Sequence, residues 1–264
     1  MSRGRGTFDS SDVTIRPPDP LIASRTVFRS PHTIPLILIA LVISAITAAT
    51  ALLIDWFPEQ AAEQAVRVDQ LMWFLVISSG AVFVLVTTFL VYSVWKFRAA
   101  PGDESEGPPI HGNHRLEVAW TIIPVILLTV MVVWAILVTN RNEALAGDRQ
   151  PIDVKAWQFA WEFTYPELGV SSGDLVVPVG RQVELRMRST DVIHNFAVPE
   201  LRVKRDVVPG ITTRLIFDPT RPGTYPVICS ELCGVGHSVM RARLVVKSQA
   251  DYAAWAANAR AAAK

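Results

Sequence analysis

Three long apolar stretches constrain the fold of this chain more than any other feature. They run from Ile34 to Ile54, from Leu71 to Val94 and from Val118 to Val138. A helix of about 20 apolar residues crosses the hydrocarbon core of a bilayer, where only helices and closed barrels satisfy every backbone hydrogen bond. The sequence therefore predicts three transmembrane helices in the lipid bilayer, and we expect them at residues 34–57, 70–98 and 115–139.

The first stretch has two interpretations. Its small residues near 45–51 would suit a signal peptidase, so residues 34–57 could be a signal segment. Signal peptides, however, have a short basic leader and a short apolar core. Here the polar, arginine-containing tail of residues 1–33 is long, and so is the apolar run after it. We favour a retained helix, with residues 1–33 as a cytoplasmic tail of little fixed structure.

The positions of Lys and Arg predict one orientation in the membrane. The tail is basic, and Lys96, Arg98 and Arg115 flank the loop between the second and third stretches. Positive residues stay on the cytoplasmic side, so the tail and this loop lie inside and everything after Asn140 lies outside. The net charge of +1 argues against nucleic acid as a partner.

The exported part is predicted to be an all-β sandwich. Residues 149–247 contain many short strand-like runs separated by Pro, Gly and Asp turn signals, which is typical of a Greek-key fold. We expect strands at 174–179, 182–189, 195–198, 212–217, 224–228 and 242–246. Residues 248–264 should form a C-terminal helix that is capped by Ser248 with Asp251 and packs through Tyr252 and Trp255.

An aromatic run lies near the start of this domain. Between Val154 and Tyr165, aromatic side chains occupy alternate positions, namely Trp157, Phe159, Trp161, Phe163 and Tyr165. A period of two predicts a single strand with these residues on one face. By pattern alone, such a face is more typical of a packed core than of a redox path.

The only two cysteines stand in a short loop with other soft donors. Cys229 and Cys233 are followed by His237 and Met240. Soft sulfur ligands select copper or zinc over hard cations, and a thioether favours copper. A further ligand is expected from another loop, and His194 is the best candidate because the other histidines lie in the tail or in a polar loop between apolar stretches.

Three other interpretations of the cysteines remain open. They could form a disulfide, which is common in exported domains. Two Cys and two His could hold one structural zinc ion, or the four residues could be unrelated core residues. Met240 and the upstream His194 favour copper. Mononuclear blue-copper sites use one thiolate, so the second one suggests two coppers bridged by both sulfurs.

The pattern Cys-x-x-x-Cys-x-x-x-His-x-x-Met, with Asp191-Val192-Ile193-His194 upstream, resembles subunit II of the haem–copper cytochrome c oxidases. The likeness extends from about Gln70 to Val246. It implies a cupredoxin-like sandwich and a dinuclear CuA centre. It also implies a magnesium ion at the interface with subunit I, held there by the side chain of Glu231. The copper ligands implied by the resemblance are His194, Cys229, Glu231 through its carbonyl, Cys233, His237 and Met240.

The same resemblance implies a function and partners. The chain would be subunit II of an aa3-type cytochrome c oxidase (EC 7.1.1.9) in the bacterial cytoplasmic (inner) membrane, with the CuA domain on the periplasmic side. It would accept electrons from cytochrome c or a cytochrome c domain and pass them to haem in subunit I, which supports O2 reduction to water and proton pumping. Subunit III is a further expected partner. The family usually has two transmembrane helices, so residues 34–57 are a departure.

Two alternative functions remain. The chain could be the CuA-bearing subunit of a related haem–copper reductase, or a membrane-tethered copper carrier that binds one exchangeable copper. A quinol oxidase subunit II would share the helices and the fold but lack the copper ligands, which are present here.

The resemblance also suggests where electrons and protons enter. Glu117 lies in a stretch similar to the family's Glu-x-x-Trp-Thr-x-x-Pro, whose glutamate marks the mouth of a proton-uptake path. The family has Gln-Trp-x-Trp before the copper loops, and its first tryptophan receives electrons. This chain has Phe159 there, so Trp157, two residues earlier, is a candidate substitute, and Trp161 is the third candidate.

Overall fold

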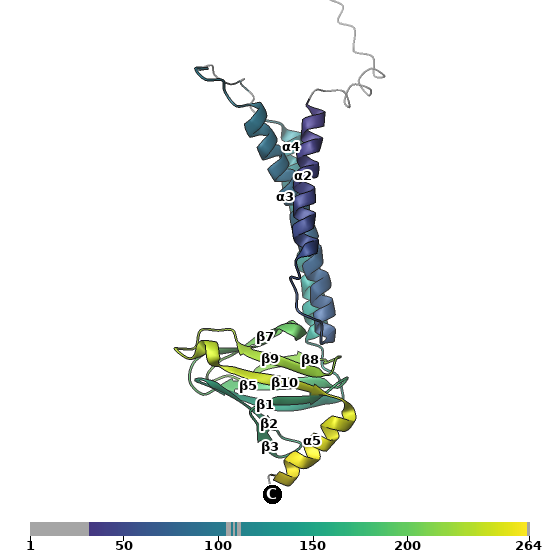
Figure 1. The fold of residues 1–264 in the computed structure, drawn as a ribbon, viewed down its shortest axis with the longest axis vertical. Helices are drawn as coiled ribbons and strands as arrows, with labels where there is room; N and C mark the ends of the chain where they lie inside the picture. Colours follow the sequence, from purple (N-terminus) through teal and green to yellow (C-terminus); the bar gives the residue numbers. More distant parts are fainter. Residues whose placement is uncertain (1–31, 104–106, 108, 110–111, 263–264) are drawn as a thin grey trace, which may run out of the picture. The chain divides into compact units, whose positions relative to one another are not determined.

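Three apolar helices precede a β domain (Figure 1). The computed structural model describes residues 32–103, 107, 109 and 112–262, so the predicted tail lies almost wholly outside the described residues. The helices are α2 (Thr33–Leu53), α3 (Glu63–Lys96) and α4 (His114–Asn142). Each is long and apolar enough to cross a membrane, and the prediction of three apolar N-terminal helices is confirmed.

The described chain divides into two compact units. One holds α2 and the part of α3 from residue 80 onward, where Gly80 lies so close to α2 that a Cβ there would be 3.4 Å from Thr47 Cγ2. The other holds residues 54–79 and those described after 106, which include α4 and the whole β domain.

The β domain consists of two five-stranded sheets. Their strand orders are β3-β2-β1-β5-β8 and β4-β10-β9-β6-β7. Most neighbours are antiparallel, whereas β1 with β5 and β10 with β4 are parallel, because the chain crosses between the sheets. The strands are β1 (Arg149–Trp157), β2 (Ala160–Tyr165), β3 (Val170–Ser172), β4 (Leu175–Pro178), β5 (Gln182–Ser189), β6 (His194–Val198), β7 (Val203–Val207), β8 (Thr213–Phe217), β9 (Gly223–Cys229) and β10 (Arg241–Lys247).

The inner faces of the two sheets form one core. Phe163 from the first sheet meets Phe196 from the second edge to face, and both side chains are fully buried. Inward residues alternate with outward ones along β2, as expected for a strand with one buried face. The predicted sandwich is therefore confirmed.

The prediction of one continuous strand from Val154 to Tyr165 is wrong. The chain turns back at Gln158-Phe159, and β1 pairs antiparallel with β2. The buried positions are even-numbered in β1 and odd-numbered in β2. After the turn, the returning strand therefore directs its odd-numbered side chains to the core. Trp157 therefore lies on the outer face, with Lys155 Nζ 5.2 Å from its ring centroid, while Trp161 faces the core.

Two edge strands were not predicted from the sequence. The short strand β3 and the strand β7 each lie at an edge of a sheet. The centre of β7 is Lys204-Arg205-Asp206, and charged residues are common on edge strands, where they discourage pairing with other chains. The hydrophobic alternation that identifies inner strands is therefore weak there.

The segment before α3 is hydrogen-bonded to the β domain. Ala61 forms backbone hydrogen bonds with Glu200 O and Thr220 N, at 3.0 and 2.9 Å. Arg202 makes a bidentate ion pair with Asp69 of α3, at 2.8 and 3.0 Å, and both side chains are over nine-tenths buried. We call this pair the Arg202–Asp69 clamp.

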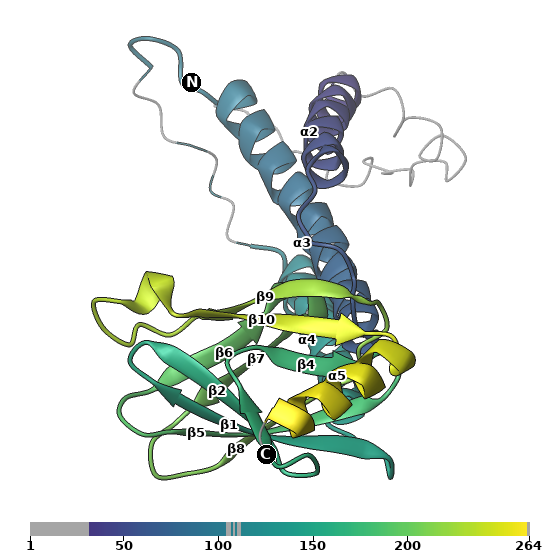
Figure 2. The same cartoon turned by 60° about the horizontal axis from the view of Figure 1, so that its bottom comes forward.

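The C-terminal helix α5 (Gln249–Ala262) packs beside the sandwich (Figure 2). The Asp251 backbone N–H donates to Ser248 Oγ at 3.1 Å, as the capping prediction requires. Tyr165 and Trp255 meet with ring centroids 5.0 Å apart, and Tyr252 is hydrogen-bonded to Gln150.

Candidate metal centre

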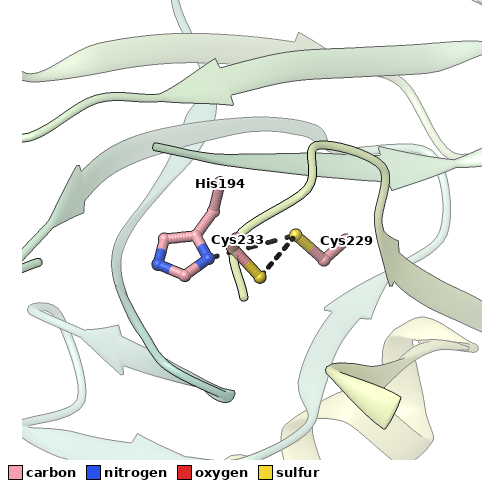
Figure 3. A group of neighbouring side chains, drawn as sticks. All are labelled: His194, Cys229 and Cys233. Atoms are coloured by element: carbon pink, nitrogen blue, oxygen red, sulfur yellow. Dashed lines mark hydrogen bonds between the residues drawn. The ribbon is translucent and has the colours of Figure 1, made fainter. Parts of the chain in front are cut away.

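Two neighbouring strands bring the predicted ligands together. His194 begins β6 and Cys229 ends β9, and these strands pair antiparallel with Phe196 opposite Cys229. The start of one strand therefore lies beside the end of the other, which places His194 next to the cysteine loop (Figure 3). The candidate ligand atoms of His194, Cys229 and Cys233 all lie within 4.8 Å of one another.

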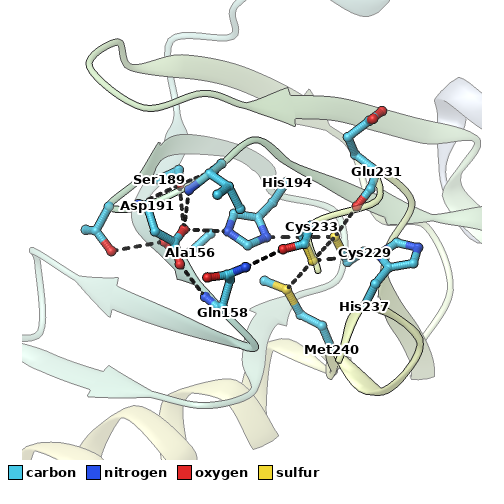
Figure 4. A network of polar contacts seen from close by, with 12 residues as sticks. Ala156, Gln158, Ser189, Asp191, His194, Cys229, Glu231, Cys233, His237 and Met240 are labelled. Carbon is cyan, nitrogen blue, oxygen red and sulfur yellow. Dashed lines mark hydrogen bonds and ion pairs between the residues drawn. The ribbon is translucent and has the colours of Figure 1, made fainter. Parts of the chain in front are cut away.

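The two cysteines form the middle of the group. Both are free, and their Sγ atoms are 3.8 Å apart. His194 Nδ1 is 4.0 Å from Cys229 Sγ, and His237 Nδ1 is 3.7 Å from Cys233 Sγ. The two imidazoles lie on opposite sides of the sulfur pair (Figure 4).

Two weaker donors complete the group. Met240 Sδ is 3.8 Å from Cys233 Sγ, and the Glu231 carbonyl oxygen is 3.3 Å from Cys229 Sγ. The Glu231 side chain points away from the sulfurs (Figure 4) and is exposed. Cys229, Cys233, His194 and Met240 are buried, whereas His237 is half-buried.

The donor set fits soft metal ions. A metal–thiolate bond is about 2.3 Å long, as in zinc sites, so one ion touches both sulfurs when they are less than about 4.6 Å apart. The 3.8 Å separation satisfies this, and each sulfur has its own histidine. The thioether and the thiolates favour copper over harder ions.

The Cys233 thiol is held protonated at neutral pH in the absence of a cation. Burial raises the pKa of Cys233, and its hydrogen bond and charge interaction with Cys229 raise it further, to about 11. Since a metal binds the thiolate, uptake of metal must release this proton.

Asp191 holds the buried histidine in position. Its Oδ1 is 2.8 Å from His194 Nε2, and the backbone N–H groups of Gln158 and Val192 both donate to the same carboxylate at 2.6 Å. Burial alone would raise the pKa of Asp191, but these hydrogen bonds lower it to about 2. The carboxylate therefore stays charged at neutral pH and favours a proton on Nε2, which leaves Nδ1 free to bind metal.

We predict that Asp191→Asn weakens copper retention by about 10- to 100-fold, the usual effect of losing such a support. The asparagine amide keeps the shape of the carboxylate but accepts a hydrogen bond less strongly. The His194 ring therefore loses its fixed orientation and part of its basicity. Copper retained by the full chain against a competing chelator measures this. Asp174→Asn, which removes an exposed partner of Arg243, is the control, and equal retention in both variants would contradict the role of Asp191.

Gln158 and Phe159 connect the β1–β2 turn to the cysteine loop. Gln158 Nε2 donates to the Cys233 carbonyl at 2.5 Å. Phe159 packs against Gly236 so closely that a Cβ there would lie 2.5 Å from Phe159 Cδ2. The turn thus supports both the histidine loop, through Asp191, and the cysteine loop.

The structure separates the three aromatic candidates for electron uptake. Trp161 is 4% exposed, and its ring meets His194 edge to face with centroids 6.1 Å apart. Phe159 lies under the cysteine loop. Trp157 is half-exposed on the outer face, so the expectation that it shares a face with Trp161 is wrong.

Glu117 is not part of the metal centre. It lies in the first turn of α4, half-exposed, with its carboxylate 3.9 Å from His114 Nδ1.

The sequence pattern indicates no role for Gln158, and it includes Asp191 mainly as one position of the Asp-x-x-His motif. That spacing is the sequence signal for Asp191, because its carboxylate is hydrogen-bonded to the histidine three residues later. The role of Gln158 depends on contacts with residues 33 and 75 positions away.

Comparison with known proteins gives consistent matches over both parts of the chain. Residues 154–249 match the family described as cytochrome c oxidase subunit II, periplasmic domain. Residues 47–138 match the one described as cytochrome c oxidase subunit II, transmembrane domain, a match that begins within α2.

Individual relatives carry the same description. Cytochrome c oxidase subunit 2 of Synechocystis sp. is 35% identical, over 76% of this chain and 75% of that protein. The protein of the same name from Thermostichus vulcanus is 32% identical, over 75% of this chain and 76% of that protein. The crystal structure of the periplasmic domain of subunit II of cytochrome oxidase from Bradyrhizobium japonicum is 26% identical, over 44% of this chain and 97% of that one, with a TM-score of 0.42.

Proposed function

The chain belongs to the cytochrome c oxidase subunit II family, and from this membership we propose that it is the electron-accepting subunit of an aa3-type cytochrome c oxidase. In this proposal it receives electrons from cytochrome c or a cytochrome c domain and passes them to haem in subunit I. Subunit I then reduces O2 to water and pumps protons, with subunit III as a further partner.

The observation that carries this proposal is the sulfur pair. Two free thiols lie 3.8 Å apart, each with its own imidazole nitrogen within 4.0 Å, and this supports a centre with one histidine for each of two copper ions. When bound, a dinuclear copper centre supplies one-electron transfer with little rearrangement of its ligands. His194, Cys229, Cys233, His237, Met240 and the carbonyl of Glu231 are the residues that would hold it.

The protein contributes rigidity and shielding. His194 and Met240 are fully buried, and His194 is fixed by Asp191. Cys229 is fixed by its place at the end of β9, where its backbone N–H donates to Met240 O at 3.2 Å. Ligands held in this way move little when the charge of the site changes, which is what a transfer site needs.

The remaining parts of the proposal follow the family. The exposed Glu231 carboxylate is free to bind magnesium together with subunit I. Glu117, at the start of α4, is proposed as the mouth of a proton-uptake path. The membrane is proposed to be the bacterial cytoplasmic membrane, with the β domain on the periplasmic side, in keeping with the positive-inside rule.

Metal stoichiometry tests the proposal. We expect the purified full chain, loaded with copper, to retain two coppers and to give an electron paramagnetic resonance spectrum of one electron shared between them. A membrane-tethered copper carrier would instead bind one exchangeable copper. Retention of a single labile copper, or oxidation of the two thiols to a disulfide on loading, would overturn the proposal.

A further inference from the structure

Asn195 is a buried polar residue beside the metal centre that has no place in the donor set. It follows His194 in β6 and is 8% exposed. An asparagine amide carries two N–H donors and one acceptor oxygen, and a buried donor or acceptor that is left unpaired costs free energy. The partners of this amide therefore indicate which parts of the fold it holds together.

Asp206 fixes the orientation of this amide. The two residues are register partners between β6 and β7, and Asn195 Nδ2 donates to Asp206 Oδ1 at 2.6 Å. A carboxylate accepts hydrogen bonds and donates none, so the NH2 end of the amide must face Asp206. The oxygen end of the amide is then available to a donor from the cysteine loop.

Ser230, in the cysteine loop, makes two hydrogen bonds to Asn195. Its Oγ donates to Asn195 Oδ1 at 2.7 Å, and its backbone N–H donates to Asn195 O at 3.0 Å. The side chain and the main chain of one residue therefore fix this serine in both position and orientation. The contact joins the residue after His194 to the residue after Cys229, 35 positions away in the sequence.

The residue after Ser230 carries one of the two weaker donors of the site. The carbonyl oxygen of Glu231 is 3.3 Å from Cys229 Sγ and points toward the sulfur pair (Figure 4). The segment from Ser230 to Leu232 lies in no helix or strand, so no regular ladder of backbone hydrogen bonds holds it. The two hydrogen bonds from Ser230 to Asn195 therefore restrain the peptide that presents this oxygen.

The distance of a weak donor matters for redox chemistry. At copper sites with thiolate and imidazole ligands, a weak axial donor such as a thioether or a backbone oxygen tunes the reduction potential. An oxygen dipole stabilises the oxidised state, which carries more positive charge, more than it stabilises the reduced state. A carbonyl that is held close therefore keeps the reduction potential lower than a carbonyl that is free to move away.

We propose that Asn195 is a positioning residue of the metal centre. Oriented by Asp206, it holds Ser230, and it thereby sets the place of the Glu231 carbonyl relative to the sulfur pair and lowers the reduction potential of the site. The inference rests on the proposed function, which supplies the redox-active copper. Asn195 acts through Ser230 and is not itself a ligand, and no bond is made or broken in this role.

Redox titration of the copper-loaded full chain in detergent, against a soluble one-electron dye, tests the proposal. Asn195→Leu removes both hydrogen-bonding ends of the amide, and Ser230→Ala removes only the hydroxyl. Each should shift the electron-exchange equilibrium about 2- to 10-fold toward the reduced form, the range that one net hydrogen bond supplies, with two coppers retained. An unchanged equilibrium in Ser230→Ala would overturn the proposal, and this variant decides the question if Asn195→Leu does not fold.

Ser171→Ala is the matched control. Ser171 lies in β3 of the other sheet, and its Oγ is 2.8 Å from Thr164 Oγ1 in an exposed hydrogen bond. The control therefore also replaces serine by alanine and also removes one hydrogen bond between side chains. We expect its equilibrium to equal that of the unchanged chain. Equal shifts in Ser171→Ala and Ser230→Ala would contradict a role for the Asn195–Ser230 contact.

A double-mutant cycle tests whether the two residues act together. The double variant Asn195→Leu/Ser230→Ala should shift the equilibrium no further than Asn195→Leu alone, because both single changes remove the same side-chain hydrogen bond. Shifts that simply add would show that the two residues act separately, and the proposal would then be wrong. Failure of the unchanged chain to load two coppers would instead contradict the proposed function, so the two failures are distinct.

Discussion

Replacing Cys233 by serine is expected to reduce the copper content of the full chain from two ions to one at most. It should also lower electron uptake from a reduced cytochrome more than about 100-fold, beyond the 10- to 100-fold effect of changes outside the ligand set. Cys233 Sγ has three other candidate donors within 3.8 Å, namely Cys229 Sγ, His237 Nδ1 and Met240 Sδ. A serine hydroxyl is a harder donor that keeps its proton, so it does not replace a thiolate ligand.

Metal analysis and stopped-flow reduction of the same preparation measure both effects. Leu232→Ala is the matched control, because Leu232 lies in the same loop, is 79% exposed and holds no candidate donor. Far-ultraviolet circular dichroism should show the same fold in both variants. A Cys233→Ser chain that retains two coppers and its electron uptake would contradict the assignment of the sulfur pair.

The largest effect on stability is expected for Arg202→Leu. This change leaves the carboxylate of Asp69 buried without its cation, and breaking a buried ion pair costs about 3–5 kcal/mol. Arg202 also donates to the carbonyls of Pro199 and Pro58, at 2.7 and 2.6 Å. Its guanidinium carbon lies 5.7 Å from the centroid of the Phe57 ring. The substitution therefore removes several contacts that join the segment before α3 to the β domain, whereas the backbone hydrogen bonds of Ala61 with Glu200 and Thr220 remain.

An exposed ion pair in the same region supplies the control. Arg221 and Glu59 are 2.9 Å apart, with side chains 60% and 51% exposed, and such surface pairs contribute about 0–1 kcal/mol. Denaturant unfolding of the full chain in detergent, followed by tryptophan fluorescence, compares Arg202→Leu with Arg221→Leu. The double variant Arg202→Leu/Asp69→Leu should recover part of the loss, since no charge is then left buried. Similar costs for the two single variants would contradict the importance of the Arg202–Asp69 clamp.

The sequence was most informative where a local property determines the outcome. The three apolar stretches predicted α2, α3 and α4 because a run of such length and composition has only one stable form in a bilayer. Short alternating runs predicted most strands of the sandwich, since burial of one face imposes a period of two. The spacing of Cys229, Cys233, His237 and Met240 identified a soft-metal loop, because those donors lie within one short segment.

The sequence was misleading where neighbours along the chain are not neighbours in space. Alternation from Val154 to Tyr165 continues through a turn, so the pattern alone did not reveal that β1 and β2 fold back on each other. The turn places Trp157 outside and Trp161 inside, although both follow the same period in the sequence. Pairing with a partner strand, and not the pattern itself, decides which face is buried.

The chemistry of the donor loop and the number of apolar helices were thus determined by the sequence itself, because each depends on residues within one segment. Only the tertiary structure decided which residues hold those donors and the neighbouring segments in place. Asp191 is hydrogen-bonded to Gln158, 33 positions away in the sequence. Gln158 is hydrogen-bonded to Cys233, 75 positions away, and Asp69 to Arg202, 133 positions away. Such contacts exist only after the chain has folded, because the energy that holds each pair comes from burial and hydrogen bonds between segments that are distant in the sequence.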